Sequence, residues 1–202
     1  LYNSTVGENR AGSGSGIYTD TTATFVNVTF GWNYDGDGKE GDAIYNASET
    51  EPIYLYNTLL MAPGREGSHC RKDFGVIIAI GSMAEDDSCG DATVFEAYDP
   101  YSIHYRYSPG ETSFFTLTLD DDYPAIDAGD NAICQASPIN GVDQRGVPRP
   151  DTWSSCDVGA TETDDGSRAY CAALANSPVS VSSEDDLNRW IPCYNAAGSG
   201  SY

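Results

Sequence analysis

The stretch FVNVTFGWN at residues 25–33 decides the fold, because its pattern returns elsewhere in the chain. The segments LYNSTVGEN at residues 1–9 and LYNTLLM at residues 55–61 also place an apolar residue, then Asn two positions on, then an apolar residue three later. Between them, GSGIYTD at residues 14–20 returns as GDAIYNA at residues 41–47. Short β-rich runs repeated between Gly and Asp turns are typical of a solenoid, whose coils bury their apolar faces only against neighbouring coils.

The remaining patterns also favour strands over helices. The run FGVIIAIG at residues 74–81 is continuously apolar and flanked by glycines, which favours a strand covered on both faces or a strand inside a solenoid. One helix is predicted at residues 182–194, where a Ser cap and an acidic first turn precede Leu187, Trp190 and Ile191 on one face. The sequence therefore predicts an all-β fold with a short strand and helix segment near its C-terminus.

The composition excludes some partners. Ten basic and 31 acidic residues among 202 give a formal net charge of -21, which repels nucleic acid and anionic membranes. No stretch is long and apolar enough to cross a bilayer, so we expect no nucleic-acid partner and no membrane insertion. No signal peptide opens the chain, so we expect Leu1 not to be the biological start.

Six cysteines fall into three successive close pairs, which suggests disulfides in an oxidising compartment. The spacing favours pairing each cysteine with its neighbour: Cys70 with Cys89, Cys134 with Cys156, and Cys171 with Cys193. A zinc site is disfavoured because the chain has no CxxC and only two histidines, His69 and His104. We therefore expect an extracellular or cell-surface location.

Two groups of segments resemble a known family. AIYN at residues 43–46, YNTLLM at residues 56–61 and the stretch at residues 68–90 look like the last coils of secreted right-handed parallel β-helix proteins of the pectate-lyase-like superfold. The remaining segments are similar to the closing part of that group, often described as a choice-of-anchor type Q region in large bacterial surface proteins: PAIDAGDNAIC (124–134), DQRGVPRP (143–150) and CDVGATE (156–162).

The resemblance implies three parts. Residues 1–162 would be the end of a parallel β-helix with its closing motif, residues 163–177 a linker, and residues 178–202 the start of a following β-helix. Cys134 and Cys156 would tie down the irregular end of the first. The closing motif also contains three aspartates expected to bond backbone amides in turns: Asp127, Asp143 and Asp157.

Three asparagines lie in N-x-S/T sequons, Asn3, Asn27 and Asn46, and in a secreted protein each could accept a glycan. Asn3 and Asn27 occupy the same repeat position as Asn57, which has no sequon, so a stacked, inward asparagine ladder explains them better. Asn46 falls in a connecting loop and is the best glycan candidate.

The loop NYDGDGKEGD at residues 33–42 alternates oxygen-bearing residues with glycine, as calcium loops do. An EF-hand loop counted from Asn33 would need Glu where Ile44 stands, so turns made by Asp-Gly pairs are the favoured interpretation. The alternative is a nonstandard calcium site, with calcium as the one candidate cofactor, at Asp35, Asp37 and Asp42.

No residue is assigned a catalytic role. The adjacent carboxylates of TLDDDY at residues 118–123 point to alternate faces of a strand. Of the two candidate basic residues, Arg145 lies in the closing motif and Arg106 has no matching acidic coil. We therefore expect a structural module of a surface protein or filament that associates head-to-tail with copies of itself or with adjacent β-helix domains. An adhesin that binds glycans or cell surfaces through its acidic, tyrosine-rich surface is the first alternative, and a polysaccharide lyase or hydrolase the second.

Overall fold

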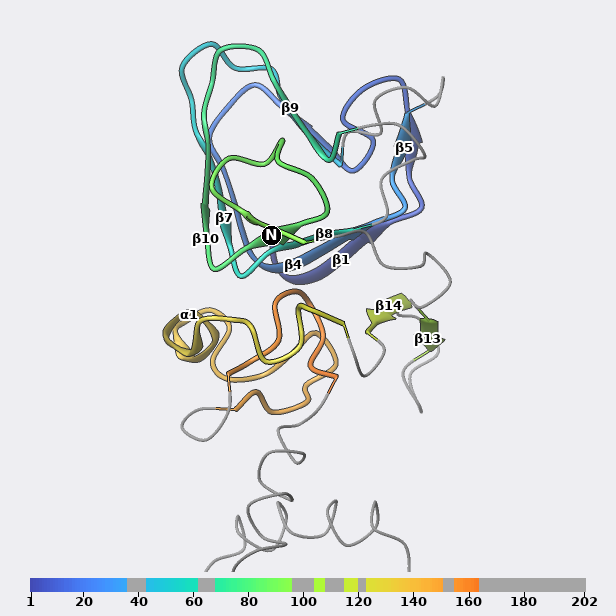
Figure 1. The fold of residues 1–202 in the computed structure, drawn as a ribbon, viewed down its shortest axis with the longest axis vertical. Coiled ribbons are helices and arrows are strands. Elements are labelled where there is room, and N and C mark those ends of the chain that lie inside the picture. Colours follow the sequence, from blue (N-terminus) through green and yellow to red (C-terminus); the bar gives the residue numbers. More distant parts are fainter. Residues whose placement is uncertain are drawn as a thin grey trace, which may run out of the picture.

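The computed structural model describes residues 1–35, 43–61, 68–95, 104–107, 115–119, 123–150 and 155–163. These residues are nearly all β, with one short helix, α1 (Asn131–Gln135), so the all-β prediction is confirmed (Figure 1). The strands in chain order are β1 (Tyr2–Gly7), β2 (Arg10–Ala11), β3 (Ile17–Thr19), β4 (Ala23–Gly31), β5 (Tyr34–Asp35), β6 (Ile44–Asn46), β7 (Ile53–Tyr56), β8 (Leu59–Met61), β9 (Cys70–Lys72), β10 (Ile77–Ile80), β11 (Met83–Ala84), β12 (Thr93–Val94), β13 (His104–Tyr107) and β14 (Phe115–Thr118).

The strands fall into repeats that pair in parallel with the next repeat along the chain. The first repeat is β1 to β3, the second is β4 to β6, and the third is β7 to β9. β4 pairs with β1 on one side and with β7 and β8 on the other, and β10 and β11 continue this sheet. β6 pairs in the same way with β3 and β9. The parallel sheets curl into a half-barrel (Figure 1).

The inward positions of these strands form an apolar core. Phe25 and Phe30 of β4 meet edge to face, with ring centroids 5.4 Å apart. The buried members of this inner core are Phe25, Val28, Phe30, Ala43, Ile44, Ile53, Leu55, Leu60, Cys70, Ile77, Ala79, Ala84 and Cys89. Burial of these side chains is the main favourable term that holds the repeats together.

A second core lies outside the sheet, under the segment we call the closing segment, residues 123–150 and 155–163. Leu60 of β8 points inward, whereas Leu59 and Met61 point outward, so β8 is covered on both faces. Gly31 lies close under Leu117, because a Cβ on Gly31 would be 2.5 Å from Cδ1 of Leu117. The outer core contains Leu59, Met61, Met83, Phe95, Leu117, Leu119, Tyr123, Ala125 and Val158.

The run at residues 74–81 contains β10, which ends the parallel sheet beside β7 and buries Ile77 and Ala79. Its other face is open, because Ile80 is 46% exposed. The helix that the structure contains, α1, was not predicted. It begins at Asp130, whose Oδ1 accepts a hydrogen bond of 2.8 Å from the amide of Ala132. The helix predicted at residues 182–194 lies outside the described residues, as do the segment 178–202 and the linker after Thr163.

Candidate functional site

A row of asparagines marks a bend in the main sheet, within β1 and β4 and between β7 and β8. The pairing of β1 with β4 and of β4 with β7 aligns Asn3, Asn27 and Asn57, and all three have positive φ, of 43°, 51° and 44°. Gly81 follows β10 at the equivalent position, with φ of 60°. Asparagine and glycine tolerate this left-handed conformation better than other residues do, which explains the repeat seen in the sequence.

The asparagine side chains point out of the inner core and hold the closing segment. Nδ2 of Asn57 donates to the carbonyl of Asp130 (3.0 Å), and the amide of Asp130 donates back to Oδ1 of Asn57 (2.9 Å). Nδ2 of Asn3 donates to the carbonyl of Val142 (2.8 Å). The stacking that the sequence predicted is therefore present, but the inward orientation was wrong. The closing segment supplies the polar partners that an apolar coil interior lacks.

Within the described ranges the structure contains two disulfides, and each joins a cysteine to the next cysteine along the chain. Cys134 and Cys156 are bonded within the closing segment, directly over the asparagine row. Nδ2 of Asn27 and Nδ2 of Asn57 lie 3.3 Å and 3.2 Å from Sγ of Cys134. Cys70 of β9 is bonded to Cys89. The third predicted pair, Cys171 with Cys193, lies outside the described residues.

The Cys70–Cys89 bond anchors a segment that covers one end of the inner core. We call residues 85–92 the plug. Cys89 is fully buried and Ala92 packs against the inner core. Oδ2 of Asp86 accepts the amide of His69 (2.7 Å), and a Cβ on Gly90 would lie 2.3 Å from the carbonyl oxygen of Ile77. The plug thus covers the end of the stack formed by β10 and β11 with residues of the same chain.

The opposite end of the stack lacks such a cover among the described residues. Val6 and Ile17 of the first repeat are only partly buried, whereas their register partners Phe30 and Ile44 are fully buried. Each strand of the first repeat pairs with the second repeat alone in this part of the chain. Leu1, next to β1, is 49% exposed. As far as the structure describes the chain, the first repeat therefore has one unpaired edge on each of its strands, and partly exposed apolar side chains lie beside these edges.

One arginine organises the closing segment. Arg149 is buried and all five of its N–H groups have an acceptor. Its Nη1 donates to Oε2 of Glu162 at 2.9 Å, and both side chains are fully buried. The other acceptors are the carbonyls of Val142, Asp157 and Gly159 and Oδ1 of Asn3. Arg149 thus joins three parts of the closing segment to the first repeat.

Two buried aspartates fix the turns around this arginine. Asp143 accepts the amides of Arg145, Val147 and Glu162 at 2.7 to 2.9 Å, and Asp157 accepts the amides of Asp127 and Thr163. These bonds agree with the turn-capping role expected for Asp143 and Asp157. Arg145 pairs with Asp143 at 2.6 Å, so its charge serves the same turn. Carboxylates engaged in this way hold backbone conformation.

Burial changes the acidity of the carboxylates in this cluster. Burial, reinforced by the charge of Asp157, raises the pKa of Glu162 to about 9, and the Arg149 guanidinium only partly opposes this. Burial also raises the pKa of Asp157, against the hydrogen bonds from Thr163. Glu162 is therefore protonated in the folded protein near neutral pH.

A second buried polar group connects the plug region to the closing segment. The hydroxyl of Tyr123 donates to Oε1 of Glu85 (3.1 Å), and Nε2 of His69 lies 3.7 Å from Oε2 of the same carboxylate. Burial raises the pKa of Tyr123, so its hydroxyl remains a donor. His69 is buried and thus part of the packed structure.

The preferred glycan site does not fit the fold. Asn46 ends β6 with its side chain fully buried, and its Nδ2 donates to the carbonyls of Glu51 (3.0 Å) and Val76 (3.3 Å). A glycan on this nitrogen would displace both bonds, so the assignment of Asn46 to an open loop was wrong. Asn27 is also fully buried, and the amide of Asn3 is engaged by Val142.

The predicted calcium loop cannot be placed, because Asp37 and Asp42 lie outside the described residues and only the backbone of Asp35 is described. In the described ranges, no group of three or more His, Cys, Asp or Glu side chains is arranged to hold a metal ion. Among the same residues, no helix is long and apolar enough to span a membrane.

Comparison of the chain with protein-family models, with curated proteins and with solved structures gave no match.

Proposed function

We propose that this protein is an extracellular structural module of a surface protein or filament, built as a right-handed parallel β-helix in which each repeat is one coil. Three repeats in parallel register support this proposal, since parallel strands need crossover connections that are nearly always right-handed. Two disulfides support an oxidising, extracellular setting.

The module associates head-to-tail through its first coil. The observation that carries this step is the difference in burial between equivalent positions, because Val6 and Ile17 are partly exposed where Phe30 and Ile44 are fully buried. A coil stacked on the first repeat would bury these side chains and pair the free edges of β1, β2 and β3. At the plugged end of a second copy, β10 is the terminal strand of the main sheet among the described residues, and its edge is of the same parallel type.

Sedimentation velocity of the full chain over a wide concentration range tests this function. We expect oligomers that grow with concentration, and we expect Val6→Asp to shift the distribution to monomer by placing a charge in the new interface. Ile17→Asp provides an independent variant at the same end. Ala132→Asp is the matched control, because Ala132 is exposed on α1 of the closing segment, outside the first repeat and outside β9 and β10. A monodisperse monomer at every concentration would contradict head-to-tail association.

A further inference from the structure

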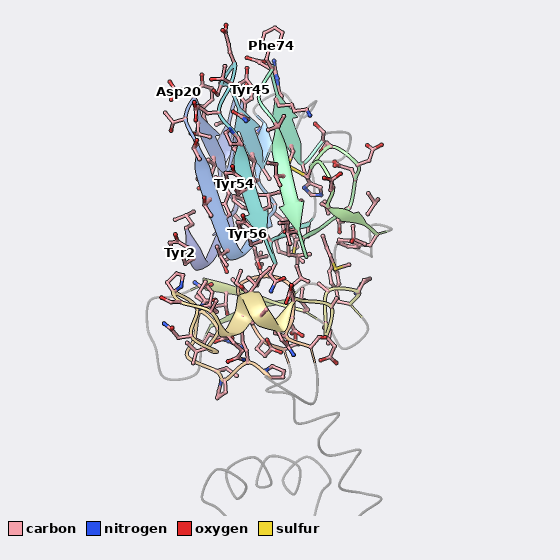
Figure 2. All side chains as sticks on the ribbon, turned by 90° about the vertical axis from the view of Figure 1, so that its left-hand side faces the viewer. Tyr2, Asp20, Tyr45, Tyr54, Tyr56 and Phe74 are labelled. Carbon is pink, nitrogen blue, oxygen red and sulfur yellow. A yellow bond between two sulfur atoms is a disulfide. The ribbon has the colours of Figure 1, made fainter. Side chains whose placement is uncertain are left out.

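The outer face of the main sheet carries no charged side chain at the outward positions of its strands. In β7 the inward residues Ile53 and Leu55 are buried, which places Tyr54 and Tyr56 on the outer side (Figure 2). The same alternation holds in β4 and β10. The outward residues, which we call the tyrosine face, are Tyr2, Thr24, Val26, Tyr54, Tyr56, Ile78 and Ile80.

The register aligns these side chains in rows across the strands. Tyr2, Val26, Tyr56 and Ile80 are successive partners on β1, β4, β7 and β10. Tyr54 lies beside Tyr56 on the same strand, with ring centroids 6.2 Å apart and ring planes 6° from parallel. The two rings are therefore stacked in parallel; Tyr56 belongs to the apolar row, whereas Tyr54 stands between Thr24 and Ile78.

This surface is unusual for the molecule. The chain has a net charge of -21, yet Tyr2 is 49% exposed and Ile80 is 46% exposed beside uncharged neighbours. Acidic residues stand at the rim, where Asp20 and Glu51 are exposed near one end of the strands. Contiguous apolar surface with a polar rim marks an interaction site.

Size and charge restrict the partner. The tyrosine face covers four strands about 4.8 Å apart and about five residues along each strand, at about 3.3 Å per residue. Its area is therefore about 300 Å². A stable protein interface needs about 800 Å² on each partner, so the face is too small for a second copy. Acidic polymers are repelled by the net charge of -21.

We propose that the tyrosine face binds an uncharged polysaccharide. The C–H faces of successive sugar rings pack against the parallel rings of Tyr54 and Tyr56, and sugar hydroxyls exchange hydrogen bonds with the phenol groups. A long, uncharged and amphipathic polymer fits a flat apolar row with polar tips, whereas acidic chains meet the carboxylates at the rim. This binding activity is separate from the proposed head-to-tail association and does not depend on it.

Retention of the full chain on insoluble cellulose and insoluble chitin, with immobilised polygalacturonate as the acidic polymer, tests the proposal. We expect retention on at least one uncharged polymer and none on polygalacturonate. The double variant Tyr54→Ala, Tyr56→Ala should weaken retention about tenfold or more. The double variant Tyr54→Phe, Tyr56→Phe should keep most of it, because the rings remain.

Tyr18→Ala is the matched control, since Tyr18 is an exposed aromatic (60%) on β3, in a different sheet, where it packs against Tyr45. Thermal unfolding midpoints equal to the wild type show that the variants fold. The proposal is overturned if neither uncharged polymer retains the protein, or if the double alanine variant binds as the wild type does. It is also overturned if the double alanine variant changes only self-association, which would assign the face to a second copy.

Discussion

The guanidinium of Arg149 lies 2.9 Å from Oε2 of Glu162, and both side chains are buried in the closing segment. The same guanidinium reaches Oδ1 of Asn3 at 3.5 Å, so one cation connects residues that are 146 positions apart. Removing this cation is costly, because the acceptors that it leaves behind stay buried and cannot form hydrogen bonds with water instead.

Replacing Arg149 with methionine should therefore lower the free energy of unfolding by about 3 to 5 kcal/mol. The variant removes one donor from each of the carbonyls of Val142, Asp157 and Gly159. Urea denaturation measures the loss. Arg71→Met is the control, since Arg71 is exposed and lies over the Tyr45 ring, and it should cost about 1 kcal/mol or less. A loss at Arg149 no larger than at Arg71 would contradict the assigned role.

The raised pKa of Glu162 predicts a pH dependence of stability. The carboxyl has its ordinary pKa of 4.5 in the unfolded chain and about 9 in the fold, so between these values the folded protein holds a proton that the unfolded chain has lost. Its contribution is fully present below about pH 4.5 and is lost as the pH rises through 9. Unfolding free energies measured by urea denaturation at several pH values should fall across this window.

Glu162→Gln is the matched variant for this pH dependence, because glutamine keeps the shape and an acceptor oxygen but does not titrate. Its unfolding free energy should depend less on pH between 5 and 9 than that of the wild type. If the unfolding free energies of the two proteins change with pH in the same way, a group other than Glu162 is responsible for the pH dependence.

The disulfide over the asparagine row predicts a local change on removal. Cys134→Ser with Cys156→Ser should destabilise the protein by about 3 kcal/mol, the loss expected when a loop of this size is no longer closed. Hydrogen exchange should speed up in the closing segment while β4 and β7 keep their protection, because the inner core is separate. Equal loss of protection in both regions would mean that the two cores unfold as one unit.

Repetition in the sequence was sufficient to predict the parallel pairing. Asn3, Asn27 and Asn57 recur at one place in the repeat, and only stacked strands bring them together. Their direction could not be predicted, because it depends on a segment about 75 to 140 residues away that folds back over them. Local patterns do not encode contacts of that range.

Other residues of the closing segment and of the main sheet were harder to identify from the sequence than the asparagine row. Arg149 stands in a short proline-rich stretch with no periodicity, so nothing in the sequence distinguished it from a surface arginine. Tyr54 and Tyr56 did give a signal, since the alternation in IYLY places both on one face of a strand.

Asn57 allows the two roles of the asparagine row to be separated. Asn57→Gly keeps a residue that accepts the φ of 44° but removes both hydrogen bonds to Asp130, whereas Asn57→Ala removes the bonds and also strains the backbone. Both variants should lower the free energy of unfolding, and alanine should cost about 1 kcal/mol more than glycine. Urea denaturation of the two variants side by side gives this difference. If alanine and glycine cost the same, the left-handed bend is not what selects asparagine here, and the bonds to the closing segment alone explain the repeat.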